Sequence, residues 1–236
     1  MRTAEGNNPK PHSLGAQCRP RTRRLRGRLL LGEGHPATTG GGNECHRGAE
    51  PTHFPRRRCR HHHVALARQD GPTILVAHSY GGTVISQTGL DPKVAGLVYV
   101  AARAPDAGED FAALSAKFPT PPITPGIITS GGFKLLSQPA FLQDFANGVP
   151  RKEALTLYAA QGLLSTAPPT TSIAAWHQKP SWYAVSKNDR TINPDLERFM
   201  AQRMNATTIE ADSGHLSLVT HPDVIARLIL EAAANR

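Results

Sequence analysis

Cysteine, aromatic residues and long apolar runs are all scarce in this chain of 236 residues. Its three Cys are an odd number and lie in a stretch without an apolar core, which excludes a disulfide framework. The longest early apolar run, Leu29 to Leu31, is far too short for a membrane span or for the apolar region of a signal peptide. We therefore expect a cytoplasmic protein with no membrane segment.

Residues 1–63 lack what a folded core needs. They contain no Val, no Ile and one aromatic residue, Phe54, but hold 13 of the 27 Lys and Arg and 4 of the 18 Asp and Glu, so they carry the whole net charge of +9. With so little to bury, the segment cannot offset the entropy of ordering its chain, and we predict a disordered basic arm. Residues 64–236 hold 14 basic and 14 acidic residues, which excludes a uniformly basic nucleic-acid-binding fold.

An alternation of strands and helices begins after residue 64. Thr73 to Ala77 is a short, continuously apolar run behind an Asp-Gly-Pro turn, as a strand buried on both faces requires. Two glycines then open a helical stretch that extends to Thr88, and Val94 to Val100 is a second buried-strand candidate. Apolar strands joined by a helix predict an α/β fold with a mostly parallel sheet.

Residues 105–180 differ from this pattern, because ten prolines separate short apolar groups. We interpret them as a helical lid insertion with irregular connections, within a domain that spans residues 64–236. Further strands are expected at 182–185 and 207–209.

Two helices are expected in the last part of the chain. One follows Asn193, a helix cap with Pro at the first helical position. The other is terminal and begins with a capping box formed by Thr220 and Asp223.

The segment Ala77-His78-Ser79-Tyr80-Gly81-Gly82 lies directly between a buried strand and a helix. This is the context of a nucleophile elbow, a turn so tight that only small residues fit two positions before and after the serine. A Gly-rich turn with an incidental Ser is the alternative. The flanking strand and helix favour Ser79 as a nucleophile.

A serine nucleophile needs a base, and the base needs an acid to orient it. In chains with a nucleophile elbow, the order is Ser, then Asp or Glu, then His. Of the three His after Ser79, His215 follows the last strand candidate, and we predict it as the base, with His221 as a capping or surface residue and His177 as structural. For the acid we prefer Asp189, which follows a strand directly, over Asp212, which precedes His215 on the same loop.

Residues 69–236 resemble a serine esterase of the α/β-hydrolase superfamily, similar to bacterial relatives of plant methylesterases and hydroxynitrile lyases. The resemblance rests on the segments DGPTILVAHSYGG, DPKVAGLVYVAARAPDAGE, NDRTINPDLERFMAQRM and GHLSLVTHPDVIARLI. It implies Ser79 as nucleophile, Asp189 as acid and His215 as base in a Ser-His-Asp acyl-enzyme mechanism. It also implies that residues 105–180 form a lid over the pocket.

The resemblance favours hydrolysis of small carboxylic esters over cyanohydrin cleavage. Lyases of this group usually carry Lys directly after the catalytic His, where this chain has Leu216. The backbone N–H of Tyr80 would be one oxyanion donor. Neither a cofactor nor a metal is required, the expected partner is a small-molecule ester, and the oligomeric state is left open.

The resemblance stops upstream of the elbow. This superfamily has an earlier strand that ends in a His-Gly loop, which supplies the second oxyanion N–H, and residues 1–63 do not match it. Their composition is typical of a GC-rich gene translated out of frame, and a divergent basic arm is the other explanation. Without the earlier strands, Thr73 to Ala77 would be an exposed sheet edge, and we expect the enzyme to be impaired or inactive.

Two other functions of the arm are disfavoured. Arg21 to Arg28 and Pro55 to His63 could bind phosphates, but no aromatic residues are interleaved with them to stack on bases. Zinc could be bound by a cluster without any Cys-x-x-Cys pair, namely Cys18, Cys45, His46, Cys59 and His61 to His63.

Overall fold

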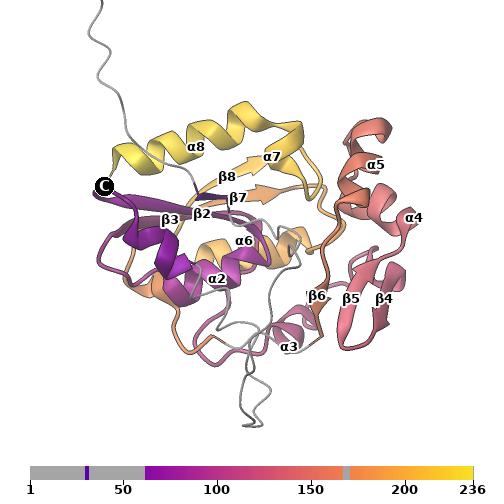
Figure 1. Ribbon diagram of the computed structural model, residues 1–236, viewed down its shortest axis with the longest axis horizontal. Coiled ribbons are helices and arrows are strands. Elements are labelled where there is room, and N and C mark those ends of the chain that lie inside the picture. Colours follow the sequence, from indigo (N-terminus) through magenta and orange to yellow (C-terminus); the bar gives the residue numbers. More distant parts are fainter. Residues whose placement is uncertain (1–29, 32–61, 167–170, 236) are drawn as a thin grey trace, which may run out of the picture.

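A parallel sheet forms the centre of the molecule in the computed structural model, which describes residues 30–31, 62–166 and 171–235 (Figure 1). The strand order is β1-β2-β3-β7-β8, and every neighbouring pair is parallel. The strands are Leu30–Leu31 (β1), Thr73–Ser79 (β2), Val94–Ala102 (β3), Ser181–Ser186 (β7) and Thr207–Ala211 (β8). The predicted α/β class is confirmed, and each strand expected after residue 64 is slightly longer than its apolar run.

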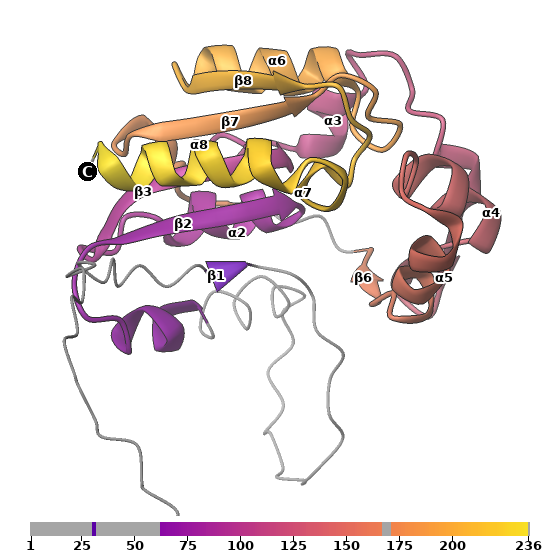
Figure 2. The same ribbon diagram turned by 90° about the horizontal axis from the view of Figure 1, so that it is seen from above.

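Helices cover both faces of this sheet (Figures 1 and 2). Helices α2 (Gly81–Thr88) and α6 (Pro194–Arg203) lie on one face, and α8 (Pro222–Ala234) lies on the other. The alternation of side chains along β2 explains both layers. Leu75 and Ala77 belong to the apolar cluster of the α2 and α6 face, whereas Ile74 and Val76 pack in the cluster of α8.

The predicted cap of α6 is confirmed, and the predicted cap of α8 is wrong. The Asn193 side chain accepts from the N–H of Asp195, with Pro194 at the first helical position. At α8 the cap is His221, without a side-chain cap hydrogen bond. The Thr220 hydroxyl is engaged instead by Ser213 at 2.6 Å and by the carbonyl of Leu216 at 3.3 Å.

The segment between β3 and β7 contains the predicted helices together with short strands that the sequence did not predict. Strands β4 (Ile127–Ser130), β5 (Phe133–Leu136) and β6 (Leu164–Ser165) form a small antiparallel sheet. Its helices and turns are α3 (Phe111–Ser115), α4 (Gln138–Ala140), a π-helical turn (Phe141–Phe145), α5 (Arg151–Ala159) and two 3₁₀ turns (Thr124–Gly126 and Ala175–His177). Elements α4, α5 and β4 to β6 lie beyond the carboxyl ends of the central strands (Figures 1 and 2).

The turn between β4 and β5 explains why this hairpin forms. Gly131 and Gly132 both have positive φ angles, 55° and 81°. A two-residue turn of this kind needs residues that adopt left-handed backbone, and glycine does so without steric cost. The Gly-Gly pair between two apolar runs was therefore a hairpin signal that the high proline content obscured.

The edge of β2 that faces away from β3 is partly paired with another strand, β1. Leu30 pairs with Leu75 and Leu31 with Val76, so the expectation of an unpaired edge is wrong at these positions. Residues 62–67 form a short helix, which corrects the prediction of disorder at His62 and His63. The rest of the predicted arm, residues 1–29 and 32–61, lies outside the described residues. Among the helices of the described ranges, none is long and apolar enough to cross a membrane.

Candidate active site

Ser79 is the last residue of β2 and has a positive φ angle of 53°. A non-glycine residue in this conformation is strained, and such strain is typical of a nucleophile elbow. The turn is held by the N–H of Arg103, which donates to the carbonyl of Ser79 at 3.0 Å. A Cβ atom at Gly82 would lie 2.0 Å from the carbonyl oxygen of Arg103, so the approach of α2 to the end of β3 requires glycine there.

His215 and Asp189 meet beside the elbow. His215 Nδ1 lies 2.6 Å from Asp189 Oδ2, and both side chains are fully buried. The other carboxylate oxygen, Oδ1, accepts from the N–H groups of Thr191 at 2.6 Å and Ile192 at 2.9 Å. Burial acts to raise the pKa of Asp189, but the His215 imidazole and these hydrogen bonds outweigh it, so the pKa is below its ordinary value. Asp189 is therefore an oriented carboxylate behind the imidazole.

His78, which directly precedes Ser79, connects the elbow to the loop that carries His215. Its Nε2 lies 2.9 Å from the carbonyl oxygen of His215, and the two imidazole rings are 4.6 Å apart. Burial, with the neighbouring His215, lowers the pKa of His78 to about 3. A neutral ring facing a carbonyl oxygen must donate, so we assign the proton to Nε2. This bond ties the backbone of His215 to the residue that directly precedes Ser79.

The second ring nitrogen of His215 remains available for chemistry. Within the described residues, Nε2 is buried and has no hydrogen-bond partner, so the hydroxyl of Ser79 is not bonded to it. Catalytic hydrogen bonds are often long without substrate and shorten when it binds. On another side, the ring of Phe145 from the insertion lies 5.0 Å from the ring of His215. The imidazole is thus enclosed by His78, Asp189 and an aromatic residue.

Glu197 of α6 lies in the core close to Asp189. Its side chain is buried, and its Oε2 accepts from the N–H of Ser186 at 3.0 Å. Burial, and then the negative charge of Asp189, raise the pKa of Glu197 well above its ordinary value. This shift favours the protonated form of Glu197 beside the Asp189 carboxylate.

The other sequence candidates lie away from this arrangement. The Asp212 side chain is 74% exposed and accepts from Asn188 Nδ2 at 2.8 Å. His177 Nε2 lies 3.0 Å from Asp106 Oδ1, and His221 begins α8. Tyr80 directly follows Ser79 at the start of α2, as an oxyanion donor requires.

Sequence reasoning did not identify His78, Arg103 or Glu197. His78 was visible only as part of the elbow motif, because its contact with His215 spans 137 positions of the chain. The one sequence feature that could have indicated Arg103 is its position as a charged residue directly after an apolar strand. A lone acid in an amphipathic helix, such as Glu197, gave no usable signal.

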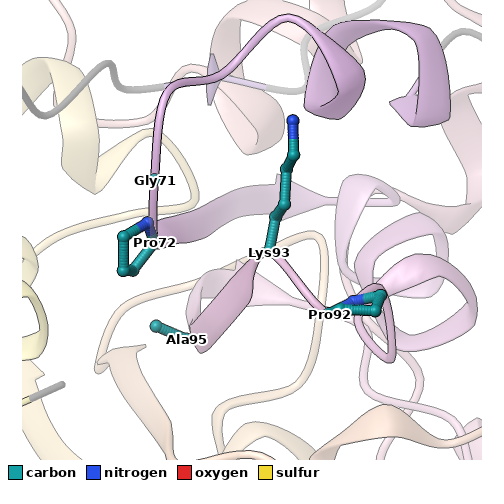
Figure 3. A pocket seen from close by; sticks show the side chains of 5 residues that line it. All are labelled: Gly71, Pro72, Pro92, Lys93 and Ala95. Carbon is teal, nitrogen blue, oxygen red and sulfur yellow. The ribbon is translucent and has the colours of Figure 1, made fainter.

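A pocket lies at the other edge of the sheet, where β2 and β3 begin (Figure 3). It is lined by Gly71, Pro72, Pro92, Lys93 and Ala95. Its one charged group is already used, because Lys93 Nζ donates to the carbonyls of Leu66, Ala67 and Gln69 at 3.0–3.2 Å. This lysine closes the end of helix 62–67, and the pocket offers no reactive group.

No cluster of His, Cys, Asp or Glu that could hold a metal ion occurs in the ranges that the structure describes. Of the zinc candidates, Cys18, Cys45, His46, Cys59 and His61 lie outside those ranges.

Comparisons with known proteins give one family. The sequence model of the alpha/beta hydrolase family matches residues 22–228, so the match begins within the segment where the sequence alone showed no resemblance. The alpha/beta hydrolase nvfD of Aspergillus novofumigatus is 27% identical over 177 residues, which cover 69% of this chain and 70% of that protein.

Solved structures agree in fold. Polyneuridine aldehyde esterase superposes with a TM-score of 0.65 at 14% identity, covering 77% of this chain and 80% of that one. A methylesterase from Arabidopsis gives 0.62 at 14% identity, with 77% and 78% covered. A pyrethroid hydrolase from Sphingobium faniae gives 0.55 at 21% identity, with 76% and 78% covered. With the elbow, the parallel sheet and a family match over most of its length, this chain belongs to the alpha/beta hydrolase family.

Proposed function

We propose that the protein is a serine hydrolase that acts on small carboxylic esters through Ser79, His215 and Asp189. The observation that carries the proposal is the buried contact of 2.6 Å between His215 Nδ1 and Asp189 Oδ2 beside an elbow serine with a φ angle of 53°. The esterases among the structural neighbours support the fold on which this chemistry would run.

In the proposed reaction, the Ser79 hydroxyl attacks the ester carbonyl while His215 Nε2 takes its proton. Asp189 holds the imidazole in the tautomer that this transfer needs and stabilises its protonated form. The N–H of Tyr80 donates to the oxyanion of the tetrahedral intermediate. His215 then protonates the leaving alcohol, and water attacks the acyl-enzyme with His215 again as base.

The alternative of cyanohydrin cleavage is not favoured by any contact. Leu216, the residue after His215, is buried in an apolar cluster with Phe141, Ala146 and Ala154, and no cation occupies that position. Nucleic-acid binding by the basic arm, impaired turnover and a cytoplasmic location stay predictions from the sequence.

A fluorophosphonate probe tests the nucleophile directly. Labelling is expected on Ser79 and should vanish in Ser79→Ala. Ser130→Ala is the matched control, because Ser130 is an exposed serine of β4. Turnover of para-nitrophenyl acetate should fall by several orders of magnitude in His215→Ala. Labelling that persists in Ser79→Ala contradicts the assignment.

A further inference from the structure

Arg103 follows β3 directly and lies beside the proposed nucleophile. Its N–H donates to the carbonyl of Ser79, and the register of β2 and β3 sets Ser79 opposite Ala102. Both residues are therefore at the carboxyl edge of the sheet. Open α/β sheets bind their ligands at this edge.

The guanidinium of Arg103 is held by two aromatic rings. Its Cζ atom lies 4.7 Å from the ring centroid of Phe111, in α3, and 5.7 Å from that of Tyr80. Cation–π attraction of this kind fixes the position of a cation without neutralising its charge. Because Tyr80 follows Ser79 in the chain, the contact ties the guanidinium to the turn that carries the proposed nucleophile.

No carboxylate of the described residues pairs with this guanidinium, and its buried Nε atom has no hydrogen-bond partner among them. The three acids that follow it in sequence are each engaged elsewhere: Asp106 with His177, Glu109 with Arg203, and Asp110 as the cap of α3. Burial lowers the pKa of Arg103, and the nearby Tyr80 offsets this effect only in part.

Two other arginines of the described residues are each paired with the carboxylate of an acidic residue. Arg203, with 17% of its side chain exposed, pairs with Glu109 at 2.7 Å, and Arg190 pairs with Asp144 at 2.7 Å. A buried charge is costly unless a partner compensates it. Within the part of the chain that the structure describes, Arg103 has no such partner, and it lies at the edge where a substrate would bind.

We propose that Arg103 binds a carboxylate group of the substrate, so that the enzyme acts on small esters that carry a free carboxylate in their acyl or alcohol part. The planar guanidinium can donate two parallel N–H bonds to a carboxylate, which gives orientation as well as affinity. This inference rests on the proposed serine-esterase function and names its substrate class.

Two matched ester pairs test the inference in the full chain. The acyl pair is para-nitrophenyl hydrogen adipate and para-nitrophenyl hexanoate, and the alcohol pair is meta-acetoxybenzoate and meta-tolyl acetate. For at least one pair, kcat/KM should be higher for the anionic ester. Arg103→Met, which keeps a long side chain between the rings, should lower the anionic-to-neutral ratio about 10- to 100-fold, the range of a hydrogen bond to a charged group. Arg103→Lys should retain part of the preference.

Arg198→Met is the matched control, because it removes an exposed arginine of α6 and should leave the ratio unchanged. Equal losses on both esters of a pair would show that Arg103 only supports the fold, and a wild-type enzyme without preference would overturn the inference. In both cases Ser79-dependent hydrolysis of the neutral esters would still stand.

Calorimetric titration with adipate and with hexanediol gives a readout without turnover. Adipate alone should bind, and binding should persist in Ser79→Ala and be lost in Arg103→Met. Absence of adipate binding to the wild type would overturn the inference even if no ester is hydrolysed. A wild-type protein that binds adipate but hydrolyses none of the esters would instead contradict the proposed function.

Discussion

The histidine that joins the elbow to the base loop should make the protein sensitive to mild acid. His78 has a pKa of about 3 in the fold and is neutral there, whereas the ordinary pKa of an unfolded histidine is 6.5. Acid therefore protonates the unfolded chain first. The stabilisation from the lowered pKa is fully present above the unfolded value and is lost as pH falls from there toward about 3.

The size of this effect follows from linkage. One pKa unit corresponds to about 1.4 kcal/mol, so lowering the pH from about 7 to about 5 should remove at most about 2 kcal/mol of unfolding free energy through His78 alone. His78→Gln keeps an N–H donor at the end of the side chain but does not titrate. The variant should lack this part of the acid sensitivity.

Urea unfolding followed by circular dichroism at a series of pH values measures the difference. The loss of unfolding free energy between about pH 7 and about pH 5 should be about 2 kcal/mol smaller in His78→Gln than in the wild type. His177→Gln, which removes an imidazole that is 54% exposed, controls for the loss of any one histidine. Identical pH dependence in wild type and His78→Gln would refute the reasoning.

The remaining predictions concern the acid, its buried neighbour and the arm. Asp189→Asn should lower kcat about 10⁴-fold because the imidazole loses its orienting carboxylate, whereas Asp212→Asn should retain activity; the reverse order in a kinetic assay would assign the acid to Asp212. Glu197 has a raised pKa, so its contribution to the unfolding free energy is fully present below the unfolded pKa and is lost as pH rises. In Glu197→Gln, the unfolding free energy measured by urea unfolding should decline less with rising pH. An unchanged decline would contradict protonation of Glu197 in the fold. If residues 1–63 bind duplex DNA, the affinity measured by filter binding should fall steeply with salt, and affinity that survives their deletion would exclude the arm.

The features that the sequence predicted well are those with local causes. Continuous apolar runs bounded by turn residues identified the buried strands, and the elbow was recognisable because its strand, serine and helix are adjacent in the chain. Asp189 was preferred because it follows a strand, and the structure does place its carboxylate against His215.

The features that the sequence did not predict depend on contacts between distant segments. The bond from His78 to the carbonyl of His215 and the raised pKa of Glu197 arise from packing that composition does not encode. The pairing of β1 was missed because a two-residue strand carries almost no periodic signal. The lack of an acid partner for Arg103 among the described residues likewise depends on distant contacts, because Asp106 and Glu109 are engaged by His177 and Arg203.

The long insertion joins two strands that are direct neighbours in the sheet. Leu97 of β3 pairs with Ser181 of β7 in parallel register, so the chain leaves β3 at the carboxyl edge of the sheet and enters β7 from the amino edge. For a flexible connection, doubling its length adds only about 0.6 kcal/mol of closure entropy. The insertion can therefore be lengthened, shortened or exchanged at small cost to the register of the parallel strands. Exchange of this segment would alter the surroundings of His215, which Phe145 contacts, while the parallel strands keep their register.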